Sequence, residues 1–234
     1  MLKSSQKKES CPLLSELDPQ VKALLEQFQA NAAQHPAPTT SLSPEEKVAA
    51  SRQLVSTSAI LGYPAEPVLR SEDFDIPSPA GKVPVRLYVP HTEEPLPIAA
   101  PAMVYYHGGG FVAGDLESHD TLLRALANRA QCIAVSVAYR LAPENPYPAA
   151  NDDAWTALRW VADHASEIGV DPQRITVGGD SAGGLLAAWV AKKRRKMAPC
   201  YVFRCFFTQT STLPPRSLHG RHWEPAHTSF RMQR

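Results

Sequence analysis

The pattern of apolar and polar positions changes character along the chain. Residues 13–33, and a second stretch that opens at Ser43-Pro44, carry apolar residues at helical spacing, with a proline-containing break at 35–38 between them. Asp18-Pro19 supplies a helix-start signal, an N-cap followed by proline at the first helical position. The apolar positions are Val21, Leu24, Leu25 and Phe28 in the first helix, and Val48, Leu54 and Val55 in the second. This helical region, residues 1–62, either covers a substrate as a cap or packs on the edge of a sheet.

From Val68 onward, short β-branched runs alternate with helical stretches. The pattern predicts strands at 68–76, 83–89, 103–106, 132–137 and 174–177, and helices at 116–130, 152–164 and 185–191. The first two strands are close enough to form an antiparallel hairpin, and the later alternation predicts a mostly parallel sheet with helices on both faces. Residues 63–196 are therefore predicted to be an α/β core. Its inward-facing helical residues are expected to be Leu122, Leu123 and Leu126, then Trp155, Leu158, Trp160 and Val161.

The alternation ends near residue 196. Residues 201–207 are compatible with one more strand, but the rest of 197–234 is rich in Pro, Ser, His and basic residues and is predicted to be disordered. Residues 1–191 contain 14 Lys and Arg against 22 Asp and Glu, whereas 192–234 contain 10 against 1. A truncation, an alternative splice or a change of reading frame would each produce such a switch.

Composition narrows the class of protein. The chain has 234 residues, 44% of them hydrophobic, which is enough for a sizeable core. No apolar run approaches the length of a membrane span, and no apolar stretch follows the N-terminal lysines, so a cytoplasmic protein without a signal peptide is predicted. The four cysteines show neither metal-ligand spacing nor a disulfide framework, and Cys132 is expected to be a buried free thiol. No metal or cofactor is predicted.

One short motif carries the candidate chemistry. Gly179-Asp180-Ser181-Ala182-Gly183 fits G-x-S-x-G and stands between a predicted strand and a predicted helix, as a nucleophile elbow does. The flanking positions must be small, because neighbouring backbone passes close to them. Ser181 would lie at a helix N-terminus, where free N–H groups favour developing negative charge. The alternative is a glycine-rich turn in which Ser181 serves only as an N-cap.

A second motif strengthens the first. His107-Gly108-Gly109-Gly110-Phe111 follows the strand that ends at Tyr106, and three glycines there allow backbone to approach a ligand closely. Such a loop donates one N–H of an oxyanion hole, and the residue after the nucleophile, here Ala182, donates the other. Two motifs in the right order are far more specific than either alone.

With Tyr139–Glu144 as a third motif, the chain resembles the hormone-sensitive-lipase-like group of α/β-hydrolases, carboxylesterases that cleave short-chain esters. The resemblance covers roughly residues 15–195. It implies an α/β-hydrolase fold with an N-terminal helical cap and a small ester as the partner. Ser181 would be the nucleophile, with an oxyanion hole of Gly109, Gly110 and Ala182. The supporting residues would be His107, Gly108 and Asp180, and Glu144 would order the loop beneath the active site. The ester and the oligomeric state stay open.

The chain departs from this family after Ser181. The family's catalytic acid and then its histidine follow the nucleophile, on loops after two later strands. Residues 197–234 are too few for those strands, and their only candidates are Glu224 and His219, His222 and His227, which are not expected to complete a triad. A weak or inactive esterase is therefore expected. The alternatives are a non-catalytic ligand-binding or regulatory form and a non-functional fragment.

Other interpretations of these residues are disfavoured. Gly108-x-Gly110-x-x-Ala113 matches a dinucleotide-binding pattern, but the next strand ends in Ala138-Tyr139-Arg140, without the required acid. The basic run 192–196 is expected to be a solvated helix end rather than a nucleic-acid patch. His107 precedes Ser181 and so does not suit the role of base in this fold. Structural roles are expected for His119, beside Asp120, and for Asp152 and Asp153 as acids in the first turn of a helix.

Overall fold

Residues 19–34, 42–60, 64–92 and 99–195 are described by the computed structural model. The chain divides into two compact units, residues 1–50 and residues 51–234. In the first unit, α1 (Pro19–Gln34) begins at the predicted proline. Val21 and Leu25 on this helix are exposed.

The start of α2 (Pro44–Ile60) is confirmed and has a clear physical basis. The Glu46 N–H donates to Ser43 Oγ at 3.2 Å, and the Ser43 N–H donates to Glu46 Oε2 at 2.8 Å. This reciprocal capping box satisfies two backbone donors that a helix start leaves without intrahelical partners.

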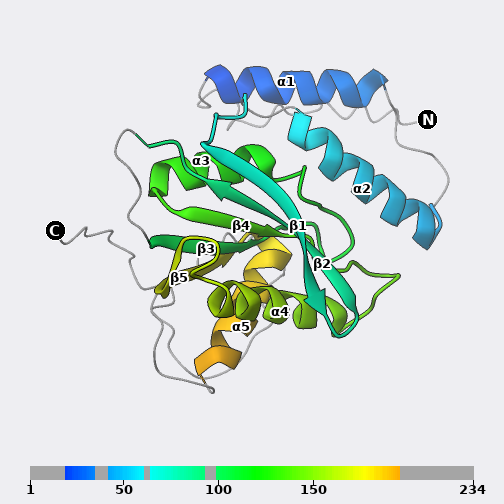
Figure 1. The fold of residues 1–234 in the computed structure, drawn as a ribbon. Coiled ribbons are helices and arrows are strands. Elements are labelled where there is room, and N and C mark those ends of the chain that lie inside the picture. The colour runs from blue at the N-terminus through cyan, green and yellow to red at the C-terminus, as the bar shows by residue number, and fades with distance from the viewer. Residues whose placement is uncertain (1–18, 35–41, 61–63, 93–98, 196–234) are drawn as a thin grey trace, which may run out of the picture. The chain divides into compact units, whose positions relative to one another are not determined.

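Five strands form the sheet of the second unit, in the order β1-β2-β4-β3-β5 (Figure 1). They are β1 (Arg70–Ser78), β2 (Gly81–Val89), β3 (Ala100–Tyr106), β4 (Ile133–Val137) and β5 (Val170–Gly179). β1 and β2 form the predicted antiparallel hairpin, and β2 is also antiparallel to β4. β3 pairs in parallel with β4 and with β5. Every strand except β2 therefore runs in one direction, which confirms the mostly parallel sheet.

The helices of this unit cover both faces of the sheet, as predicted (Figure 1). α4 (Ala149–Asp163) and α5 (Ser181–Arg195) pack on one face against a core that includes Val104, Val135 and Leu158. α3 (Asp120–Ala130) packs on the other face against Met103 and Ala134. Neighbouring residues of β3 and β4 thus contribute to opposite cores, as side chains of a strand that is buried on both faces must.

The start of the third helix differs from the prediction. α3 begins at Asp120 rather than near residue 116. The Ser118 N–H donates to Asp115 Oδ1 at 2.7 Å, and the Asp115 N–H donates to Ser118 Oγ at 2.9 Å. These side chains bond locally to the backbone and so hold it in a turn that competes with helix. Leu122 is 41% exposed, so its predicted inward position is wrong, while Leu123 is fully buried.

The last strand also differs in its bounds. β5 begins at Val170, earlier than predicted, and its register with β3 shifts between the pair Ala100–Val170 and the pair Ala102–Ile175. Within the shifted segment, Asp171 accepts hydrogen bonds from the Gln173 N–H and from Arg174 Nε. The extra residues interrupt the alternation on which a sequence-based strand prediction depends.

One lysine near the end of α5, Lys193, packs against aromatic rings, while Lys192 is exposed as predicted. The ammonium of Lys193 lies 4.9 Å from the ring centroid of Trp155 and 4.7 Å from that of Trp189. Each contact is a cation–π interaction, and the aliphatic stem of such a lysine covers apolar surface. The basic run therefore packs, at this one residue, against α4 and α5.

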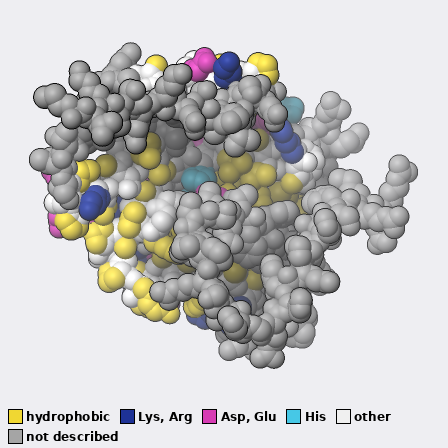
Figure 2. All heavy atoms as spheres, turned by 180° about the vertical axis from the view of Figure 1, so that it is seen from behind, with side chains coloured by type: hydrophobic (Ala, Val, Ile, Leu, Met, Phe, Trp, Pro, Cys, Tyr) yellow, Lys and Arg dark blue, Asp and Glu magenta, His cyan; other side chains and the backbone are white. Residues whose placement is uncertain are grey.

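Two further predictions, on Cys132 and on membrane-spanning segments, can be compared with the structure. Cys132 is buried and free, and burial raises the pKa of its thiol to about 11. Among the residues described above, no helix is both long and apolar enough to cross a bilayer. The cytoplasmic location and the domain bounds at 62 and 196 stay predictions, and residues 201–207 lie outside the described residues. Hydrophobic side chains also reach the surface, in groups on the face seen from behind (Figure 2).

Candidate active site

Ser181 occupies a sharp turn between a strand and a helix. β5 ends at Gly179, α5 begins at Ser181, and the side chain of Ser181 is exposed. The φ angle of Ser181 is +47°, in the left-handed region that residues other than glycine rarely adopt. The predicted strand–turn–helix context is therefore confirmed, and its backbone strain is of the kind that clusters at functional sites.

The two glycines that flank the serine lie against neighbouring backbone. A Cβ on Gly179 would come within 2.5 Å of the Tyr106 carbonyl oxygen. A Cβ on Gly183 would overlap that same oxygen and lie 2.6 Å from the His107 carbonyl oxygen. The end of β3 thus passes directly over the elbow, which confirms why these positions must be small.

The glycine loop after β3 is a tight turn. Gly109 has a φ of +123°, Gly110 of +64° and Phe111 of +65°. The Gly109 carbonyl accepts the N–H groups of Val112 and Ala113, at 3.1 and 3.0 Å. Glycine is needed at 109 for two reasons, since its φ is positive and a Cβ would overlap the Ala113 carbonyl.

Three backbone donors in these two segments are unpaired. Among the described residues, none accepts a hydrogen bond from the N–H of Gly109, Gly110 or Ala182. The Ala182 N–H belongs to the first turn of α5, where a helix has no partner of its own to offer. The predicted oxyanion donors are therefore free to bind an acceptor.

Asp180 joins the two segments. Its Oδ1 accepts the Gly108 N–H at 2.8 Å and the Tyr105 hydroxyl at 3.0 Å, and His119 Nε2 lies 3.1 Å away. Burial by itself would raise the pKa of this carboxyl, but the hydrogen bond and charge interaction with His119, together with the other two donors, hold it below its usual value. Asp180 is thus an ionised acceptor one residue before Ser181.

His107 is fully buried and does not reach solvent. Its Nδ1 donates to the Gly108 carbonyl at 2.8 Å, and its ring stacks on Tyr139 at 4.3 Å between centroids. Its Nε2 has no hydrogen-bond partner among the described residues. Burial lowers the pKa of His107 to about 4, so the imidazole is neutral and holds the loop in place.

This buried imidazole predicts a loss of stability in acid. The unfolded chain takes up the proton near pKa 6.5 and the folded protein only near 4, so the unfolded state binds more protons between these values. Stability should therefore decrease as the pH falls from about 6.5 to about 4, by on the order of 3 kcal/mol. His107→Asn, which keeps a donor for the Gly108 carbonyl, should flatten this part of the profile. Urea unfolding at several pH values measures it, and parallel profiles for the two proteins would contradict it.

Neither described histidine near the elbow is placed to act on Ser181. His119 Nε2 is directed at Asp180, and its Nδ1 lies 2.9 Å from Ser118 Oγ. Within the part of the chain that the structure describes, no imidazole hydrogen-bonds the Ser181 hydroxyl. The tail candidates lie outside the described residues, namely Glu224, His219, His222 and His227.

A buried ion pair supports the segment after β4, and sequence reasoning missed it. Asp153 is 1% exposed and accepts Arg140 Nε and Nη2, each at 2.8 Å, and the Arg140 N–H at 2.9 Å. Asp152 lies in the first turn of α4 as predicted, but Asp153 does not. The helix begins at Ala149, three residues earlier than predicted, so Asp153 lies in its second turn, on the buried side of the helix. No local sequence pattern pairs these two residues.

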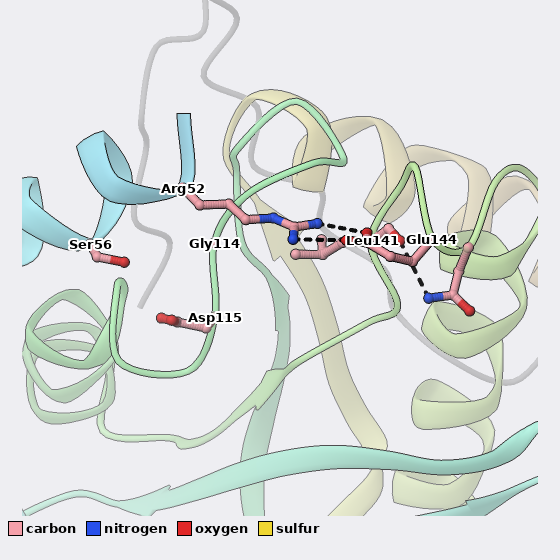
Figure 3. A pocket seen from close by; sticks show the side chains of 7 residues that line it. Arg52, Ser56, Gly114, Asp115, Leu141 and Glu144 are labelled. Carbon is pink, nitrogen blue, oxygen red and sulfur yellow. Dashed lines mark hydrogen bonds and ion pairs between the residues drawn. The ribbon is translucent and has the colours of Figure 1, made fainter. Parts of the chain in front are cut away.

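Arg52 and Glu144 connect α2 to the same segment (Figure 3). The guanidinium binds both carboxylate oxygens of Glu144, at 2.9 and 2.7 Å, and donates to the Val112 carbonyl at 2.8 Å. The hydrogen bond from Arg52 lowers the pKa of Glu144 to about 2. These contacts give a physical basis for the ordering role expected of Glu144.

A pocket of about 440 Å³ opens beside this ion pair (Figure 3). Ser181 is not among the described residues that line it. It is lined by Arg52, Ser56, Gly114, Asp115, Leu141, Glu144 and Asn145. A search of the described ranges finds no group of three His, Cys, Asp or Glu residues that could hold a metal ion.

Known proteins are similar to this chain in sequence and in fold. Esterase LipI of Mycobacterium tuberculosis is 51% identical over 156 residues, which are 66% of this chain and 48% of that protein. An ethyl acetate hydrolase of Pseudomonas putida is 42% identical over 145 residues, 62% of this chain and 45% of the relative. The chain thus spans about half the length of these relatives. The structure of a hyperthermophilic esterase from Pyrobaculum calidifontis matches 80% of this chain and 56% of its own, with 41% identity and a TM-score of 0.66.

A family model also matches a long segment of the chain. The model, described as alpha/beta hydrolase fold, matches residues 103–220. The match includes the glycine loop, the Tyr139–Glu144 segment and the serine elbow. The chain therefore belongs to the α/β-hydrolase fold family, as its resemblance to the hormone-sensitive-lipase-like group implied.

Proposed function

We propose that the chain carries the nucleophile and the oxyanion hole of a serine carboxylesterase. The observation that carries this proposal is the exposed Ser181 on a left-handed elbow, next to the unpaired N–H of Ala182. The glycine loop with two more unpaired donors is bonded to the same elbow through Gly108 and Asp180. A nucleophile beside preorganised backbone donors is what acyl transfer requires.

The proposed reaction has two steps, acylation of Ser181 and hydrolysis of the acyl-serine. Ser181 Oγ attacks the ester carbonyl carbon, and the electron pair of the C=O bond moves to its oxygen, where the N–H groups of Gly109, Gly110 and Ala182 stabilise it. Collapse breaks the bond to the alcohol oxygen, which leaves with the proton released by Ser181. Water then attacks the acyl-serine and releases a carboxylic acid and free Ser181. Such donors act in the transition state, where one of them contributes about 10²–10³ in rate.

We propose that the 234-residue chain by itself turns over esters weakly or not at all. Both steps need a base for the proton of Ser181 and of water, and losing the base costs on the order of 10⁶ in kcat in a serine protease. The acid and imidazole groups after Ser181 are those of the tail, Glu224 with His219, His222 and His227, and their spacing matches no triad motif of the family.

The proposed substrates are small esters with short acyl groups. Relatives named an esterase and an ethyl acetate hydrolase support this class of substrate. The reaction that we propose uses Ser181, a base, backbone N–H groups and water, and the small ester is its substrate.

The test is covalent labelling of the full 234-residue chain with an alkyl fluorophosphonate. Ser181 Oγ forms a bond to phosphorus, fluoride leaves, and the serine proton passes to solvent. Because the backbone donors would stabilise the charge that develops on the phosphoryl oxygen, we expect slow labelling at Ser181, seen as one adduct by intact mass. Ser181→Ala should abolish it. Equal labelling of both proteins would overturn the assignment of the nucleophile.

Steady hydrolysis of p-nitrophenyl acetate tests the proposed weak turnover. We expect a rate close to that of Ser181→Ala. A high rate that Ser181→Ala removes would show a functional base and overturn the weak-turnover proposal. Labelling without turnover, with a ligand-induced rise in melting temperature, would indicate the non-catalytic binding form.

A further inference from the structure

We propose that Asp180 and His119 are positioning residues that set the oxyanion loop against the nucleophile. This inference rests on the proposed function and assigns to two side chains the alignment of its two halves. Asp180 binds the loop through the Gly108 N–H, and His119 holds the carboxylate that does so.

The hydrogen bond between Gly108 and Asp180 lies next to both functional positions in the chain. Asp180 precedes Ser181, and Gly108 precedes Gly109, so one hydrogen bond of 2.8 Å joins the neighbour of the nucleophile to the neighbour of an oxyanion donor. The two segments also touch directly, because a Cβ on Gly108 would overlap the Asp180 carboxylate. Any displacement of this carboxylate therefore moves the Gly109 N–H relative to Ser181.

Other hydrogen bonds hold the loop to a different part of the fold. The Tyr139 hydroxyl donates to the His107 carbonyl at 2.7 Å, and the Ala142 N–H donates to the Phe111 carbonyl at 2.8 Å. Both bonds fix the loop to the segment after β4. Within the described ranges, the bond to Asp180 is the hydrogen bond that runs from the loop to the elbow itself.

His119 is itself held firmly by its neighbours. Its side chain is 14% exposed, and its Nδ1 lies 2.9 Å from Ser118 Oγ, in the turn that Asp115 also holds. Its ring lies 5.8 Å from the ring of His107 and 6.1 Å from that of Tyr105. The imidazole therefore has little freedom to move away from Asp180.

The start of α3, next to His119, is fixed by charge. The Arg86 guanidinium contacts Asp120 Oδ1 at 3.1 Å and Glu117 Oε1 at 2.6 Å, and the Tyr88 hydroxyl donates to Asp120 at 3.0 Å. Because β2 carries Arg86 and Tyr88, the sheet itself supports the base from which His119 reaches Asp180. A catalytic constellation needs this kind of second support to stay within about 0.5 Å of its working geometry.

Paired variants separate positioning from mere stability. Asp180→Asn keeps an oxygen acceptor for the Gly108 N–H, whereas Asp180→Ala removes it. His119→Gln keeps a side-chain N–H near the Nε2 position, whereas His119→Ala removes it. Asp152→Ala, an exposed change on α4, is the matched control.

The first readout is the rate of fluorophosphonate labelling at Ser181 in the full chain. A misplacement of about 1 Å can cost 10²-fold in rate. We therefore expect Asp180→Ala to slow labelling about 10²-fold and His119→Ala about tenfold. His119→Gln and Asp180→Asn should recover most of each loss, and the control should label as the unchanged protein does.

The second readout needs no reaction. Labelling with ¹⁵N-glycine and ¹³C-carbonyl histidine selects the two glycines that follow a histidine, Gly108 and Gly220, and Gly220→Ala identifies the second by the loss of its signal. We expect the Gly108 amide to exchange with solvent faster in His119→Ala and Asp180→Ala than in their conservative partners. If an alanine variant does not fold, the labelling rate and the Gly108 exchange rate of His119→Gln and Asp180→Asn are compared with those of the control. Values well below the control for labelling, or well above it for exchange, would then overturn the positioning role.

Each outcome assigns success or failure to one proposal. Labelling that Ser181→Ala abolishes but His119→Ala and Asp180→Ala leave unchanged would overturn the positioning role and keep the proposed function. A failure of the conservative variants to recover labelling or amide protection would also overturn it. Labelling that persists in Ser181→Ala would overturn the proposed function, while the Gly108 amide would still report whether His119 and Asp180 hold the loop.

Discussion

Replacing Gly183 with alanine is expected to lower the free energy of unfolding by about 3 kcal/mol or more, the upper end for overpacking. The new Cβ would overlap the Tyr106 carbonyl oxygen and lie 2.6 Å from that of His107, and both are backbone atoms that cannot swing aside. Relief requires α5 to move away from β3, which would also displace Ser181. Thermal unfolding measures the effect, and a decrease of about 6–12 °C in the melting temperature corresponds to it.

Gly169→Ala is the matched control for this change. Gly169 has a φ of +72°, and a Cβ there would meet only Ile133 Cδ1, at 3.9 Å. Backbone strain alone then costs about 1–2 kcal/mol. If Gly183→Ala melts no lower than Gly169→Ala, the close approach of the β3 carbonyls to the elbow is not a constraint on the fold.

Asp153→Ala is expected to cost about 3–5 kcal/mol, because it removes one partner of a buried ion pair. Asp153 accepts three hydrogen bonds from Arg140, including one from its backbone N–H. Without the carboxylate, the Arg140 guanidinium, whose side chain is 29% exposed, loses its charge partner. Urea unfolding at neutral pH measures the loss.

Two further variants make this prediction specific. Asp152→Ala removes an exposed carboxylate one residue away, in the first turn of α4, and should cost less than about 1 kcal/mol through the helix dipole. The double change of Asp153→Leu with Arg140→Met removes both charges and should be more stable than Asp153→Ala. Equal stability of Asp153→Ala and Asp152→Ala would contradict the role given to the buried pair.

The sequence predicted the features whose physical causes are local. A strand, a glycine turn and a helix in succession predicted the elbow around Ser181, and the glycines of the 107–110 loop predicted its tight backbone. Turn chemistry and alternation likewise predicted the hairpin of β1 and β2. In each case, residues close in the chain carry the whole constraint, so their order is enough to reveal it.

The features that sequence reasoning missed join residues that are far apart. Arg52 and Glu144 are separated by 92 positions and Gly108 and Asp180 by 72, and nothing in either partner's neighbourhood points to the other. Asp153 was placed in a first turn because the predicted start of the helix was wrong by three residues, and its partner Arg140 lies 13 residues away, outside the helix. Pairings of this kind become visible only when the sheet order is known.

Cys132 lies beside the first residue of β4, and the reaction rate of its thiol reports on local opening of the folded chain. Thiol reagents attack the ionised form, and this thiol is both shielded from solvent and, with its pKa raised to about 11, almost entirely protonated at neutral pH. It packs with Met103, Leu123 and Ala134 between α3 and the sheet. The rate at which Cys132 is modified would therefore measure how often α3 and the sheet separate.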